Sequence, residues 1–214
     1  MAQVDIIYYL DVLSSWCHIA DRALERIESK YGSSVNVDWR IAQLFDFGPL
    51  PYSREKLVWY YARTKNIAGI QLNPEWVDSG QATTVYANQA AEAARALGAT
   101  DSTVRRALSR AAVIDGKRMG LRDVAIEEAA RASGLPAADI DRTMETPQVR
   151  NRIAQTTQEY KDLALPQLPS FVLRNTSGDL AVFSGLYTFE SLDAVIGEML
   201  HASRVTEEFG LEPV

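Results

Sequence analysis

The residues of this chain best suited to chemistry form a tetrad, Ser14-Ser15-Trp16-Cys17, which contains the only cysteine. The tetrad lies where an apolar, β-rich segment gives way to a helical pattern. The N-terminus of a helix stabilises a thiolate, because its free N–H groups and its dipole favour negative charge. The tetrad therefore lies where a thiolate is stabilised, with Ser14 just before the predicted helix and Cys17 one turn in.

Each of the two polar residues of the tetrad has a structural interpretation beside the chemical one. Ser14 is placed to cap the helix, a role worth about 1 kcal/mol, and also to donate its hydroxyl to a bound thiolate, which would lower the pKa of that thiol. Both roles can hold at once. Cys17 is either a small buried apolar residue or a redox-active thiol, and a single cysteine cannot form an internal disulfide.

Composition excludes several classes of protein. The chain has 214 residues and a formal net charge of −6, which argues against a nucleic-acid or anionic-membrane surface. No apolar run approaches the roughly 20 residues that span a bilayer. The first residues carry no basic signal-peptide region, so we expect a cytoplasmic protein. With only His18 and His201, a multi-histidine metal site is excluded, and we expect no metal.

The elements that must position the tetrad follow a β-α-β, helical, β-β-α order. Hydrophobic periodicity predicts a buried strand, a helix and a second strand, then six helices, a hairpin and a last helix: 4–13, 15–31 and 35–41; 53–66, 82–97, 101–114, 120–133, 137–145 and 147–163; 170–174 and 180–183; 188–202. The helical stretch is too long for a loop. We therefore expect one discontinuous domain, 1–45 with 164–214, and an inserted helical subdomain, 46–163.

This order, with three segments, resembles the DsbA family of the thioredoxin superfamily. Residues 11–20, Asp-Val-Leu-Ser-Ser-Trp-Cys-His-Ile-Ala, resemble Asp-Val-Leu-Ser-Pro-Tyr-Ser-Trp-Leu of kappa-class glutathione transferases and Cys-Pro-Trp-Cys-Tyr-Ile of FrnE-type DsbA relatives. Residues 168–172, Leu-Pro-Ser-Phe-Val, resemble the family's cis-proline loop, and residues 182–185, Val-Phe-Ser-Gly, its turn before the last helix. The resemblance implies an α/β fold: a thioredoxin-like domain with an inserted all-helical subdomain.

The resemblance also implies glutathione as a cosubstrate and a place for it. Its chain would lie extended beside Leu168 and Pro169, where a cis bond leaves the backbone of Leu168 free to pair. Its sulfur would lie near Ser14, and its γ-glutamyl group near Ser184 and Gly185.

Two departures from the family pattern bear on the branch of the family. Ser15 replaces the proline common after the first active-site position, and the Ser-Asp pair that grips glutathione in kappa enzymes is not visible. Residues 184–187, Ser-Gly-Leu-Tyr, stand there instead and are closer to the oxidoreductase branch.

The remaining candidates lie around the tetrad and in the insertion. Trp16 is either core or an aromatic rim for an apolar substrate. We expect His18 to be polar surface, with a catalytic base as the alternative. Lys56 shares a helix face with Trp59, Tyr60 and Arg63 (i, i+3, i+4, i+7), which is either solvated or a lid whose cations contact glutathione's carboxylate. Residues 73–76, Asn-Pro-Glu-Trp, are expected to form an irregular lid segment.

The leading hypothesis is a cytoplasmic, glutathione-dependent thiol-disulfide oxidoreductase, a disulfide reductase, with a Ser-x-x-Cys site. Its substrate would be a disulfide-containing protein or a small electrophile. One alternative uses the same site as a kappa-type glutathione transferase or a 2-hydroxychromene-2-carboxylate isomerase. The other is a non-catalytic thioredoxin-like binding or redox-sensing module. The sequence leaves a homodimer open.

Overall fold

The centre of the fold is a mixed four-stranded sheet of order β2-β1-β3-β4. The computed structural model describes all residues except 1, 46–49, 51, 80–82 and 210–214. Strand β1 (Val4–Leu10) runs parallel to β2 (Val35–Ile41) and antiparallel to β3 (Ser170–Asn175), which pairs antiparallel with β4 (Leu180–Ser184). The helix that carries the tetrad, α1 (Ser15–Tyr31), is the crossover between the two parallel strands, as the periodicity predicted.

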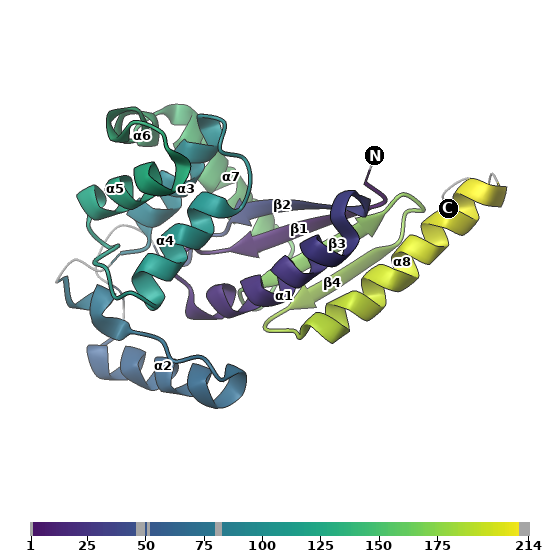
Figure 1. Cartoon of the computed structure of the whole chain (residues 1–214), viewed down its shortest axis with the longest axis horizontal. Coiled ribbons are helices and arrows are strands. Elements are labelled where there is room, and N and C mark those ends of the chain that lie inside the picture. Colours follow the sequence, from purple (N-terminus) through teal and green to yellow (C-terminus); the bar gives the residue numbers. More distant parts are fainter. Residues whose placement is uncertain (1, 46–49, 51, 80–82, 210–214) are drawn as a thin grey trace.

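Helices α1 and α8 (Phe189–Phe209) lie side by side along the sheet (Figure 1). Tyr8, on β1, stacks on Phe171 of β3 with ring centroids 4.7 Å apart. Lys30 and Tyr31 at the end of α1 both donate to the Asp193 carboxylate of α8. The last turn of α1 is therefore tied to α8 through Asp193.

Six α-helices and one short 3₁₀ helix lie between β2 and β3 in the described part of the chain. They are α2 (Arg54–Ala68), the 3₁₀ helix Pro74–Ser79, α3 (Val85–Ala96), α4 (Thr103–Val113), α5 (Arg122–Ser133), α6 (Ala137–Met144) and α7 (Pro147–Asp162). Five of the six alanines of α3 are buried, and their small side chains let α4, α5, α6 and α7 pack closely around it. The expected α/β class with a helical insertion is confirmed. The division of the chain into two domains stays a prediction.

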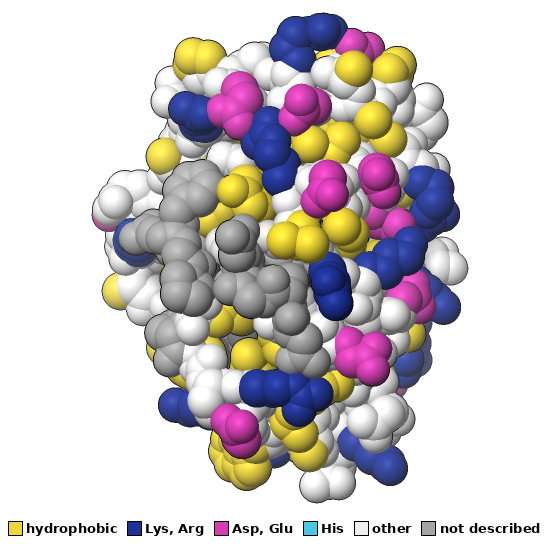
Figure 2. Space-filling model, turned by 90° about the vertical axis from the view of Figure 1, so that its left-hand side faces the viewer, with side chains coloured by type: hydrophobic (Ala, Val, Ile, Leu, Met, Phe, Trp, Pro, Cys, Tyr) yellow, Lys and Arg dark blue, Asp and Glu magenta, His cyan; other side chains and the backbone are white. Residues whose placement is uncertain are grey.

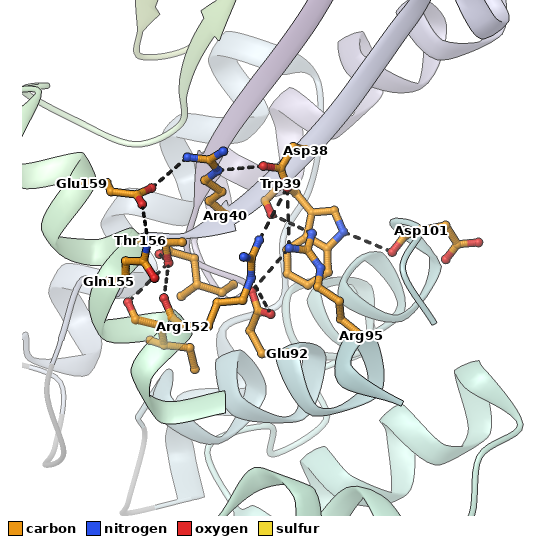
Figure 3. Close-up of polar contacts among 12 residues, drawn as sticks. Asp38, Trp39, Arg40, Glu92, Arg95, Asp101, Arg152, Gln155, Thr156 and Glu159 are labelled. Atoms are coloured by element: carbon orange, nitrogen blue, oxygen red, sulfur yellow. Dashed lines mark hydrogen bonds and ion pairs between the residues drawn. The ribbon is translucent and has the colours of Figure 1, made fainter. Parts of the chain in front are cut away.

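The inserted helices are joined to the sheet by a polar network along β2 (Figure 3). Arg95 of α3 stacks 3.3 Å from the Trp39 ring centroid and donates to the Trp39 carbonyl at 2.7 Å. Arg40 of β2 donates to Glu159 of α7 at 2.8 Å, and Thr156 of α7 to the carbonyl of Ile41 at 2.6 Å. These contacts fix α3 and α7 against the edge strand β2.

A buried ion pair joins α1 to α4. Arg105 is 1% exposed and donates to both carboxylate oxygens of Asp21, at 2.6 and 2.9 Å, and to Ser102.

On the surface of the molecule that lies at the left of Figure 1, positive and negative side chains are interspersed (Figure 2). Among the described residues, no helix combines the length and apolar character that a membrane span requires.

Three expected boundaries are wrong by three residues or more, and one of them is the start of α3, at Val85 rather than 82. The first strand ends at Leu10 rather than 13, because Asp11 starts a turn: its carbonyl accepts the N–H of Ser14, and its carboxylate accepts the N–H of Leu13. The last helix continues to Phe209 rather than ending near 202. Ser203, the first residue beyond the expected end, is buried, and its hydroxyl donates to the Met199 carbonyl.

Candidate functional site

The tetrad forms the start of α1, and Ser14 is its N-cap. The Ser14 hydroxyl oxygen accepts the N–H of Cys17 at 3.4 Å, which confirms the expected cap. Within the described part of the chain, the N–H groups of Ser15 and Trp16 have no hydrogen-bond partner. The first turn therefore presents free donors beside a hydroxyl, in the region where the helix dipole favours an anion.

Cys17 lies beneath this cap and is shielded from solvent. It is 2% exposed, and the hydroxyl of Tyr8 donates to its carbonyl at 3.0 Å. Burial raises the pKa of the Cys17 thiol to about 12, although hydrogen bonds from Ser14 and from the Asp11 backbone act in the opposite direction. The thiol is thus protonated at neutral pH, and the nucleophile of a thiol reaction here would have to come from outside the chain.

Asp11 is a fully buried carboxylate at the bottom of the site. One oxygen accepts the N–H of Leu13, and the other accepts from Leu44 N–H, the Thr84 hydroxyl and the Asn88 amide, at 2.8 to 3.2 Å. Burial raises its pKa, and these four donors lower it in part. Asp11 was not among the residues that the sequence singled out for chemistry, although it stands three positions before Ser14 in the motif.

A largely apolar cavity of about 410 Å³ opens at the start of α1, and we call it the α1–α2 cavity. Its wall holds the polar residues Asp11, Ser14, Ser15 and Thr84 and a majority of aromatic and aliphatic side chains: Leu13, Trp16, Leu44, Phe45, Leu50, Tyr52, Leu57, Tyr60, Tyr61 and Trp76. Trp16 therefore lies in the wall, where a rim for an apolar substrate was expected. The sequence did not indicate most of the other aromatic residues, because the turns and α2 bring them in from distant segments.

The expected face of α2 is split between this cavity and solvent. Tyr60 lines the cavity, whereas Trp59 is 55% exposed with the Arg63 guanidinium 4.9 Å from its ring centroid. Lys56 is exposed and outside the wall, and its ammonium lies 4.8 Å from the ring centroid of Tyr52. The four residues therefore do not act as one surface.

The segment 73–76 is not irregular, which corrects the expectation. Pro74–Ser79 forms a 3₁₀ helix, and Trp76 is buried in it. The indole of Trp76 donates to the Tyr61 hydroxyl at 2.6 Å, and both rings line the cavity. This contact fixes the 3₁₀ helix to α2 and turns the segment into a wall of the cavity.

The Leu168–Pro169 peptide bond is cis, as expected. Pairing of Tyr9 with Ser170 places this loop at the end of the sheet where β1 leads into the turn before Ser14. Leu168 and Pro169 are buried, and neither lines the α1–α2 cavity. The N–H and carbonyl of Leu168 have no hydrogen-bond partner in the part of the chain that the structure describes.

Ser184 and Gly185 contact the cis-proline loop and do not line the α1–α2 cavity. The Ser184 hydroxyl lies 3.0 Å from that of Ser170 and 3.1 Å from the Gln167 carbonyl, and Gly185 N–H donates to the Pro169 carbonyl at 2.8 Å. Gly185 has φ +110°, and a Cβ there would collide with the Gln167 amide. Their expected contact with a γ-glutamyl group stays a prediction, and the Ser184 hydroxyl is already engaged within the protein.

His18 is not the polar surface residue that we expected. It lies on the opposite side of the first turn of α1 from Trp16, partly buried, with Nδ1 3.1 Å from the Ser109 hydroxyl of α4. Burial lowers its pKa. It does not line the α1–α2 cavity. Among the described residues, no group of three or more His, Cys, Asp or Glu could hold a metal ion.

Comparisons with solved structures show a shared fold. A candidate protein disulfide isomerase from Nitrosomonas europaea is 15% identical, with a TM-score of 0.77, over 94% of this chain and 98% of the other. The cytosolic disulfide reductase DsbM of Pseudomonas aeruginosa is 20% identical (TM-score 0.70, 97% and 98% covered), and its structure with GSH is also similar, at 19% identity (0.68, 97% and 98%). 2-Hydroxychromene-2-carboxylate isomerase is 14% identical (0.64, 96% and 98%).

The sequence itself matches no curated protein significantly. A family profile, by contrast, matches residues 5–197, which include the tetrad, the whole helical insertion and the cis-proline loop. That match agrees with the cap at Ser14, the buried inner thiol and the cis bond before Pro169. The chain therefore belongs to the DSBA-like thioredoxin domain family.

Proposed function

We propose that this protein is a glutathione-dependent thiol-disulfide oxidoreductase that reduces disulfides at the start of α1. The observation that carries the proposal is the arrangement of Ser14, Ser15 and Trp16. All three residues line the α1–α2 cavity, where the hydroxyl of Ser14 lies beside the unpartnered N–H groups of Ser15 and Trp16. The chain's own thiol is buried beneath them. Such a site can stabilise a thiolate that it does not itself supply.

The chemistry needs two glutathione molecules and no redox change in the protein. A glutathione thiolate held at Ser14 attacks one sulfur of the substrate disulfide, forming a mixed disulfide and releasing the other sulfur as a thiolate, which takes up a proton. A second glutathione thiolate attacks the glutathione sulfur of the mixed disulfide. Oxidised glutathione forms, and the second substrate thiol leaves. The substrate gains two electrons, and two glutathione molecules lose one each.

The cavity wall supports an apolar or aromatic substrate next to the disulfide. The fold shared with DsbM, whose structure with GSH is known, supports glutathione as the thiol, and the cytosolic location of that protein supports a cytoplasmic one here. In this proposal glutathione lies beside Leu168 and Pro169, where the backbone of Leu168 has unused hydrogen-bonding groups. Lys56, exposed beside Tyr52 of the cavity wall, attracts a carboxylate of glutathione in this proposal.

A second candidate function is supported by the apolar character of the cavity. A kappa-type transferase or a 2-hydroxychromene-2-carboxylate isomerase would use the same thiolate against an unsaturated or aryl electrophile. The shared fold with the isomerase agrees with this alternative. Reduction of a small disulfide by glutathione without conjugation of an aryl halide would favour the reductase, and the reverse result would favour the transferase.

The test compares Ser14→Ala with Thr146→Ala. Thr146 caps α7 as Ser14 caps α1, so both variants lose a helix cap worth about 1 kcal/mol, but Thr146 is outside the cavity. A charge-assisted hydrogen bond contributes about 1.5–3 kcal/mol, so we expect Ser14→Ala to slow disulfide reduction by about 10- to 100-fold. Thr146→Ala should keep its rate.

Glutathione should also raise the melting temperature of the wild-type protein, since a ligand at a hundredfold excess over Kd stabilises by about 2.7 kcal/mol. Equal rates for the two variants would reduce Ser14 to a cap. No turnover and no thermal shift with glutathione would favour the non-catalytic binding module.

A further inference from the structure

A second cavity lies on the other side of α1, between α1 and α4. It has a volume of about 340 Å³, and we call it the α1–α4 cavity. It shares no wall residue with the α1–α2 cavity, since Trp16 faces one and His18 the other. Its wall also contains Arg22, one turn after His18 on α1, and Arg110 of α4.

The carboxylates at this cavity are already paired. Both oxygens of Asp21 accept from Arg105, and Arg106 lies 3.6 Å from Asp21 and 3.5 Å from Glu25. Arg106 also donates to Glu28 at 2.6 Å. Arg105 and Arg106 thus balance two of the three negative charges of these carboxylates. Arg22 and Arg110 are not needed for this pairing.

The guanidinium groups of Arg22 and Arg110 have no such partner. In the part of the chain that the structure describes, neither forms an ion pair or a side-chain hydrogen bond, and both are exposed at the cavity. Together they make the cavity net positive in a chain whose formal net charge is −6. Arginine pairs of this kind recognise planar or tetrahedral oxyanions, because each guanidinium can donate two parallel hydrogen bonds.

His18 is a further polar group in the wall of this cavity. Its Nδ1 lies 3.1 Å from the Ser109 hydroxyl, and its other ring nitrogen has no hydrogen-bond partner among the described residues. Burial lowers the pKa of His18. The nearby charge of Asp21 raises it in part, and Arg22 and Arg110 each lower it further. Both arginines are therefore close enough to act electrostatically on the imidazole.

We propose that the α1–α4 cavity binds a small organic oxyanion, a carboxylate or a phosphate monoester, between Arg22, Arg110 and His18. The cavity is larger than a bare phosphate ion. Its apolar walls, Ala107 and Ile114, therefore receive the uncharged part of the ligand. This site is separate from the proposed thiol chemistry and does not depend on it.

The experiment follows the two histidine side chains by NMR, because the chain contains only His18 and His201. Phenyl phosphate, benzoate and inorganic phosphate are titrated separately at constant ionic strength. We expect phenyl phosphate or benzoate, or both, to move the His18 ring signals along a saturating curve. Inorganic phosphate should bind more weakly. The signals of His201, which is exposed on α8, should stay in place and serve as the internal reference.

Three single variants locate the site. Arg22→Gln and Arg110→Gln should each weaken binding by about tenfold, because each removes a charged donor from the ligand. Arg118→Gln is the matched control, an exposed arginine outside every cavity described above, and it should bind as the wild type does. Far-ultraviolet circular dichroism checks that each variant is folded.

Several results would overturn the proposal. Signals of both histidines that move together, without saturation, would show non-specific screening. Saturation at an unchanged Kd in Arg22→Gln and Arg110→Gln would place the ligand elsewhere. Inorganic phosphate binding as tightly as phenyl phosphate and benzoate would leave an adventitious ion only.

Discussion

The buried thiol gives the sharpest test of the site, since the chain has a single cysteine. The pKa of Cys17 is about 12, against 9.0 for a free thiol, because the folded protein removes the thiolate from solvent. At pH 7 the thiolate fraction is then on the order of 10⁻⁵ in the native state and 10⁻² in the unfolded chain. Alkylation requires the thiolate. We therefore expect iodoacetamide to label native Cys17 about 1,000-fold more slowly than the denatured chain.

The assay measures label incorporation by mass spectrometry with and without denaturant. A matched reference is Ser29→Cys in a Cys17→Ser background, since Ser29 is an exposed residue on the same helix. That cysteine should react at nearly the same rate folded and unfolded. Native labelling of Cys17 within about tenfold of the denatured rate would refute the shielded-thiol interpretation and would make Cys17 a candidate catalytic nucleophile.

The same pKa shift predicts how stability depends on pH. Below about pH 9 the thiol is protonated in both states and contributes no pH dependence. From about pH 9 toward 12 the unfolded chain ionises first, so the native state loses about 1.4 kcal/mol per pH unit from this group. Urea unfolding of wild type and Cys17→Ala across this window should show a shallower alkaline loss in the variant. Parallel curves would contradict the pKa shift.

Two further substitutions test the elements that support the site. Asp11→Asn replaces a carboxylate oxygen with a donor, so it should cost about 1–3 kcal/mol for each buried donor left unpaired, measured by urea unfolding; a loss below about 1 kcal/mol would mean that the donors find water. Arg105→Met breaks the buried pair with Asp21 and should cost about 3–5 kcal/mol. Asp21→Asn in the same chain should recover part of that loss, and full additivity in the double-mutant cycle would show that the two residues do not interact.

Local patterns were enough to locate the elements of the fold. The i, i+3, i+4 spacing on α1 and the alternation in Val35–Ile41 each report on one element, and both were predicted within a residue. The end of β1 was predicted wrongly because a side chain competes with the backbone there. At Asp11 the carboxylate takes N–H groups that a longer strand would have used, and periodicity carries no signal of that competition.

The sequence by itself determined the chemistry available to this protein: one cysteine, a serine three residues before it, and a strand-to-helix junction that makes Ser14 a cap. Those features depend on neighbours within one helical turn. Only the tertiary structure decided what surrounds them, because Tyr60, Tyr61 and Trp76 reach the α1–α2 cavity from the insertion. Burial, which sets the state of the Cys17 thiol, is likewise a property of the packed elements and not of the residues in order.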